Sequence, residues 1–136
     1  MHTEHLQNVR PVTVVAAWLV SIAVTSLILL ALVGLRLLEA DSPSTRAAMA
    51  AVALGFVAGG MFAGVRTAQA PILHGVAIGL FSLVAWFVLG LLTQSLLSGS
   101  VWEVSRDLTI TAVIVQIIAS IIGARLGYRL ALRGNV

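Results

Sequence analysis

The sequence lacks cysteine and lysine altogether, and only five of its 136 residues are acidic. Without cysteine the chain can form no disulfide, no thiolate metal site and no cysteine nucleophile. Arginine therefore supplies the permanent positive side-chain charge, and its eight copies are scattered singly along the chain. Because no block of like charge is present, the sequence does not indicate binding to nucleic acid.

Charge is also absent from four long apolar stretches, which contain no Asp, Glu, Lys or Arg. These stretches are Val12–Leu35, Ala47–Val65, Ile72–Leu92 and Leu108–Ala124. Each approaches the roughly 20 residues that a helix needs to cross the hydrocarbon core of a membrane, where unpaired backbone groups find no water. We therefore expect an all-α membrane protein with a single integral membrane domain over residues 1–136. The short connections favour an up-down-up-down four-helix bundle, with transmembrane helices at about residues 12–35, 47–65, 72–92 and 108–128.

The arginines near the ends of these stretches are divided unequally between the two sides of the expected membrane. Three lie on one side, and five lie on the side that holds both termini and the second connection. The five are Arg10, Arg66, Arg125, Arg129 and Arg133. Because loops rich in arginine stay in the cytoplasm, we expect both termini to be cytoplasmic. We also expect the last four of these arginines to contact lipid headgroups.

Small residues recur at four-residue intervals in the expected helices, a pattern typical of helices that pack closely in membranes. The candidate packing residues are Ala51, Gly55, Gly59, Gly60, Ala63, Gly64, Gly75, Gly79, Gln116 and Gly123. The second stretch contains two such ladders, so we expect it to lie at the centre of the helix contacts. Packing within one chain is the favoured interpretation, and packing against a second copy or another membrane protein is the alternative.

Two segments of similar sequence suggest a repeated two-helix unit. They are Gly60-x-x-x-Gly64-x-Arg66 and Ala119-x-x-x-Gly123-x-Arg125, both at the expected cytoplasmic ends of their helices. Duplication of a two-helix unit would explain the match. The alternative is that glycine beside an arginine leaves room for the stem of that arginine to extend towards the headgroups.

The apolar stretches offer little chemistry. They contain no carboxylate, so we expect no coupling to a proton or cation gradient. His74 is the one histidine in a stretch, whereas ligation of haem by two histidines needs a second one at matching depth. His74 remains a candidate for binding a pigment or another cofactor, and a hydrogen bond to a neighbouring helix or headgroup is its commoner role. No nucleophile, base and acid converge at one depth, so we expect no enzymatic activity, no metal site and no further cofactor.

One family resemblance rests on the second and third stretches. The run from Gly59 to Ala68, followed by Leu73-His74-Gly75 and by Gly79, resembles the YrzE-like family of small four-helix bacterial membrane proteins. The resemblance implies a multi-pass protein of the bacterial plasma (inner) membrane. That family has no established activity, so the resemblance transfers no catalytic residue. It implies only a packing hairpin, formed by Gly59, Gly60, Gly64, His74, Gly75 and Gly79.

Two classes of function remain after these exclusions. The first is a non-catalytic structural or accessory subunit that packs its glycine-rich helix faces against itself or against a larger membrane complex. The second is a small uncoupled transporter, channel or lipid-handling protein for a neutral or lipid substrate. In that alternative, the path is lined by Ser21, Thr25, Ser82, Thr93, Gln94, Gln116 and Ser120. In either class the lipid bilayer is the surrounding partner.

Overall fold

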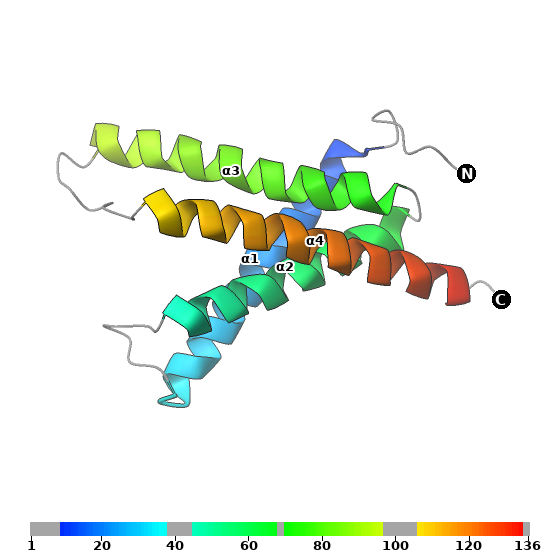
Figure 1. The fold of residues 1–136 in the computed structure, drawn as a ribbon, viewed down its shortest axis with the longest axis horizontal. Coiled ribbons are helices and arrows are strands. Elements are labelled where there is room, and N and C mark those ends of the chain that lie inside the picture. The colour runs from blue at the N-terminus through cyan, green and yellow to red at the C-terminus, as the bar shows by residue number, and fades with distance from the viewer. Residues whose placement is uncertain (1–8, 38–44, 68–69, 97–105, 135–136) are drawn as a thin grey trace.

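The computed structural model of the protein describes residues 9–37, 45–67, 70–96 and 106–134, except for the side chains of residues 93–96 and 106–109. These residues form four helices, shown in Figure 1: α1 (Pro11–Gly34), α2 (Thr45–Thr67), α3 (Pro71–Leu96) and α4 (Arg106–Gly134). Each helix contains a segment that is long and apolar enough to cross a membrane. The prediction of an all-α chain with four helices of spanning length is therefore confirmed for the described residues.

Local features mark where α1 and α3 begin and where α1 ends. Pro11 and Pro71 open these two helices, at a position where the backbone N–H that proline lacks would have no partner in the helix. After the end of α1, Arg36 adopts a left-handed conformation with φ of 57°, and the N–H of Leu37 donates to the carbonyl of Leu32 at 2.9 Å. This bond satisfies one of the carbonyls that the end of the helix leaves unpaired.

α2 is the central helix, as its two glycine ladders predict. Its contact with α4 is the most extensive one among the described residues, and its contact with α1 is the second. α1 runs antiparallel to α2, and α3 runs antiparallel to α4, whereas α2 and α4 run in the same direction. The molecule thus consists of two helical hairpins that meet through α2 and α4. In Figure 1 the hairpins lie close together near the chain termini and diverge towards the opposite end.

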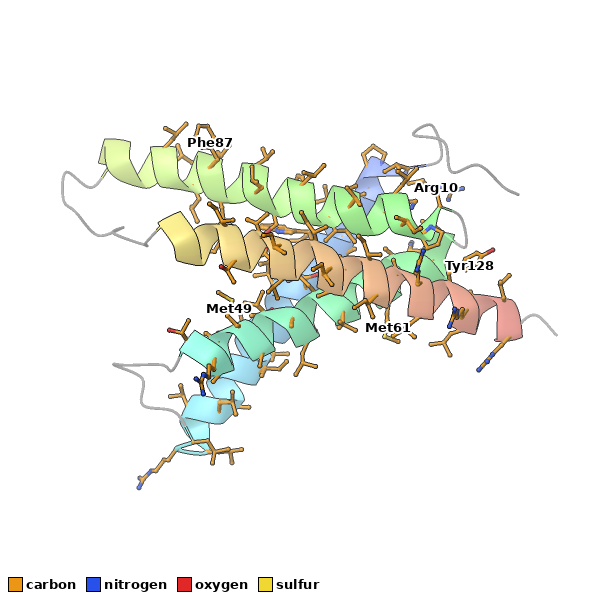
Figure 2. All side chains as sticks on the ribbon, viewed as in Figure 1. Arg10, Met49, Met61, Phe87 and Tyr128 are labelled. Carbon is orange, nitrogen blue, oxygen red and sulfur yellow. The ribbon has the colours of Figure 1, made fainter. Side chains whose placement is uncertain are left out.

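The exterior of the described chain is apolar, and much of its interior is built from small and polar residues. Leu30 is 69% exposed and Phe87 is 66% exposed, and Figure 2 shows Phe87 pointing away from α4. Ala17 and Ser21 are fully buried, and Phe56 is the largest side chain that is almost completely enclosed. This distribution is the reverse of that in a water-soluble protein, in which large apolar side chains fill the core.

Candidate functional site

The crossing of α2 and α4 is lined by glycine on both helices. The facing pairs are Gly60 with Ser120, Gly64 with Ala124, Gly123 with Val57 and Gly127 with Met61. At each of these glycines an added Cβ would lie within 3.0 Å of backbone atoms of the opposite helix. The two backbones are therefore in direct contact, which favours dispersion and weak Cα–H···O contacts that a larger side chain would prevent.

These contacts are related by an approximate two-fold symmetry. Exchanging the two helices converts the Val57–Gly123 contact into the Ser120–Gly60 contact, and it converts the Met61–Gly127 contact into the Ala124–Gly64 contact. Every position of α2 at the crossing therefore corresponds to the position 63 residues later in α4. The equivalent segments are Gly60-x-x-x-Gly64-x-Arg66 and Gly123-x-x-x-Gly127-x-Arg129.

The sequence match that suggested a repeat differs from this symmetry of contacts by four residues. It matched Gly64 with Gly123, whereas the symmetry of the contacts relates Gly64, which faces Ala124, to Gly127, which faces Met61. Gly127 is a packing residue that the sequence analysis missed, although the spacing Gly123-x-x-x-Gly127 was visible in the sequence. Small residues at four-residue intervals match in several registers, and only the contacts between the helices distinguish these registers.

The two hairpins are also closed by glycine. Gly55 and Gly59 of α2 face Ser21, Thr25 and Ala17 of α1, and Gly75 and Gly79 of α3 face Ile121 and Ile117 of α4. Ala51 and Ala63 are buried as well. Among the described glycines, an added Cβ meets nothing within 4 Å only at Gly34, Gly90 and Gly134. The candidate packing glycines therefore lie between helices of a single chain, and their faces are covered within that chain.

His74 joins the beginnings of α1 and α3. Its side chain is fully buried, the backbone N–H of Arg10 donates to Nε2 at 3.3 Å, and Nδ1 lies 3.0 Å from the carbonyl oxygen of Ala70. Because Nε2 accepts a hydrogen bond, the ring hydrogen is on Nδ1 and is donated to Ala70. Ala70 itself has a left-handed backbone with φ of 41°, a conformation that costs an L-residue about 1 kcal/mol. Both ring nitrogens are thus engaged in contacts with the backbone of the described residues.

Two buried hydroxyl groups of α1 are bonded within their own helix. Ser21 donates to the carbonyl of Ala17 at 2.9 Å, and Thr25 donates to the carbonyl of Ser21 at 2.8 Å. Both side chains lie under the glycines of α2 and do not face an open path. Two members of the polar set proposed from the sequence are therefore internal packing groups.

Other polar groups of the interior lack a hydrogen-bond partner within residues 9–37, 45–67, 70–96 and 106–134, apart from the undescribed side chains. They are the hydroxyls of Ser82 and Ser120, Oε1 of Gln116 and Nε1 of Trp18. Ser82, Ser120 and Gln116 are at most 4% exposed. Thr93 and Gln94, which complete the polar set from the sequence, have side chains outside the described residues.

The five arginines of the expected cytoplasmic side lie at one end of the molecule. This end holds the beginnings of α1 and α3 and the ends of α2 and α4, and Figure 2 shows Arg10 and Tyr128 there. All five side chains are exposed. The guanidinium of Arg66 lies over the ring of Phe62, with 5.8 Å between the guanidinium carbon and the ring centroid. Such a contact holds the stem of an arginine along apolar surface while its charged end stays free to meet solvent or phosphate.

A scan against protein-family models, a search of curated proteins and a search of solved structures each find no match to this chain. The resemblance to YrzE-like proteins therefore stays a prediction.

Proposed function

We propose that the protein crosses the bacterial inner membrane as an up-down-up-down four-helix bundle with both termini in the cytoplasm. The apolar exterior supports insertion, because an uncovered surface of this kind would drive association in water. The arginine-rich end supports the orientation, because anionic lipids of the cytoplasmic leaflet attract arginine.

The orientation predicts different labelling of the two ends. Gly134 is exposed at the end of α4, and Leu35 is exposed at the opposite end of the molecule, so each accepts a cysteine in this cysteine-free chain. In intact cells, a thiol reagent that cannot cross membranes is expected to label Leu35→Cys and to leave Gly134→Cys unlabelled. Labelling of both after cell lysis is the control. Labelling of Gly134→Cys from outside would refute the proposed orientation.

For a protein oriented in the membrane in this way, the function best supported by the geometry is that of a non-catalytic structural or accessory subunit. His74 carries this proposal, because it is the one buried ionisable side chain among the described residues and both of its ring nitrogens are bonded within the chain. An interior without a free titratable group gives no support to proton transfer, ion coupling or nucleophilic catalysis. Because the glycine faces are covered internally, the partner in this proposal contacts the outer leucine-rich surface.

An accessory subunit is expected to leave the membrane in a complex of fixed composition. Native mass spectrometry after gentle solubilisation measures this directly, because the 14.2 kDa chain is small beside any larger partner. The expected result is a complex of defined stoichiometry, formed with a second copy or with another protein. A chain that is released only as a monomer with lipid, at every detergent strength tested, would contradict the accessory role.

A second candidate function is favoured by one specific observation. The unpartnered groups of Ser82, Gln116 and Ser120 lie in the interior and carry no charge, as an uncoupled path for a neutral substrate requires. The back-bonded Ser21 and Thr25 are not part of such a path. Its described lining is therefore formed by α3 and α4.

A further inference from the structure

Serine and threonine side chains behave in two different ways in this molecule. Ser21, Thr25 and Thr67 each donate to the carbonyl one turn earlier in their own helix, at 2.8 to 2.9 Å. Ser82 and Ser120 are fully buried, yet their hydroxyls make no such bond and have no other partner among the described residues. Since the same bond is open to any serine within a helix, these two hydroxyls are directed elsewhere.

The two hydroxyls lie close in depth to a third unpartnered group. Gly75 faces Ile121 and Gly79 faces Ile117, so in this antiparallel pair Ser82 is level with residue 114. At 1.5 Å of rise per residue, Gln116 and Ser120 are then about 3 Å and about 9 Å from Ser82 along the helix axis. Gln116 and Ser120 are one turn apart and therefore share a face of α4.

A fourth unpartnered group comes from α1. The ring of Trp18 meets the ring of Phe81 edge-on, with centroids 5.3 Å apart, which brings the indole to the residue that precedes Ser82 in α3. The indole Nε1 is buried and has no hydrogen-bond acceptor in the part of the chain that the structure describes. We call Trp18, Ser82, Gln116 and Ser120 the polar cluster.

We infer that the polar cluster binds a small neutral hydroxylic molecule, either water or a small polyol. The cluster offers an indole N–H donor, an amide oxygen acceptor and two hydroxyls that can donate or accept. These groups can bond to the O–H groups of a ligand, which also donate and accept. It contains no charge that would balance an ion, and an unbalanced ion in the interior is costly. Leaving each of these polar groups without a partner is also costly, and a bridging molecule removes that cost. The site does not depend on the accessory role proposed above.

Exchange of a cysteine S–H group tests whether the cluster is hydrated. Ser82→Cys and Ser120→Cys place a thiol in the cluster, and Ile78→Cys places one in an apolar, fully buried position one turn from Ser82. After transfer of liposomes to D₂O, loss of the S–H infrared band is expected to be at least about ten-fold faster at the two cluster positions, since a dry apolar site exchanges only after local opening. Equal slow exchange at all three positions would overturn the inference.

Thermal unfolding provides a second test that does not use a thiol. If the hydroxyls of Ser82 and Ser120 bond to a ligand, alanine at either position is expected to raise the unfolding equilibrium constant about five-fold. If the hydroxyls have no hydrogen-bond partner, alanine removes the free-energy cost of burying them. Stability is then unchanged or higher, which would refute the site. Ser21→Ala is the matched control, because it loses only a bond within its own helix.

Glycerol distinguishes the two ligands of the inference. A shift of the S–H band of Ser82→Cys when glycerol is added identifies a polyol site, and this shift should be absent in Ile78→Cys. An unshifted band with fast exchange identifies resident water. Both results support the polar cluster as a binding site, whereas a shift of equal size in both variants would indicate a general solvent effect and would overturn it.

Discussion

Replacing Gly123 with leucine is expected to force α2 and α4 apart and to lower the free energy of unfolding by about 3 kcal/mol, the upper part of the range for overpacked interiors. An added Cβ at Gly123 would meet the carbonyl oxygen, the carbonyl carbon and the Cα of Val57, all of them backbone atoms. A side chain can rotate away from such a clash, but a backbone in the middle of a helix cannot. The helices can therefore accommodate leucine only by separating along the whole crossing.

The control for this substitution is Gly90→Leu in α3, where an added Cβ has nothing within 4 Å. Because leucine favours the helix more than glycine does by up to about 1 kcal/mol, this variant should be as stable as the parent or more stable. Thermal unfolding in detergent, followed by circular dichroism, compares the two variants. Equal stability of Gly123→Leu and Gly90→Leu would show that the α2–α4 crossing does not hold the hairpins together. The approximate symmetry predicts that Gly60→Leu lowers the free energy of unfolding about as much as Gly123→Leu does, because each glycine faces the backbone of the other helix.

Replacing His74 with alanine is expected to lower stability by about 3 kcal/mol, because the change empties a fully buried volume and breaks two hydrogen bonds. One bond ties the backbone of Arg10 at the start of α1 to Nε2, and the other runs from Nδ1 to Ala70. The loss therefore releases the contact between the beginnings of α1 and α3. Thermal unfolding in detergent is again the measurement.

Two further variants separate the causes of the His74 effect. His74→Phe keeps a ring of similar size and loses both hydrogen bonds, so its stability should fall between those of the parent and the alanine variant. Leu80→Ala, on the exposed side of the same helix, is the control for a truncation that creates no cavity. If His74→Ala unfolds at the same temperature as Leu80→Ala, the tie between α1 and α3 contributes little and His74 is free for another role.

The approximate symmetry of the α2–α4 crossing changes how the glycine pattern is understood. From the sequence, packing within one chain was the favoured interpretation of the glycine faces, and a partner outside the chain was the alternative. In the structure, one ladder of α2 is occupied by α1 and the neighbouring ladder by α4, with Gly59 and Gly60 as adjacent members of the two. A partner protein is thus left with the leucine-rich exterior, and the repeated glycine motif serves to join two hairpins of the same chain.

The sequence by itself determined the number, length and approximate limits of the helices, and the division of the arginines between two ends. The helices are a local property, because a charge-free stretch long enough to cross a membrane satisfies its backbone hydrogen bonds within its own helix, whatever its neighbours are. The division of the arginines then follows from their positions at the ends of these helices. The choice of partner for each glycine ladder, the register of the repeat and the hydrogen bonds of His74 were decided only by the tertiary structure. The tertiary structure also decided that the hydroxyl of Ser21 forms a hydrogen bond and that the hydroxyl of Ser82 does not. Small residues every four positions permit close approach in several registers of nearly equal quality, and only the simultaneous packing of all the helices selects one of them.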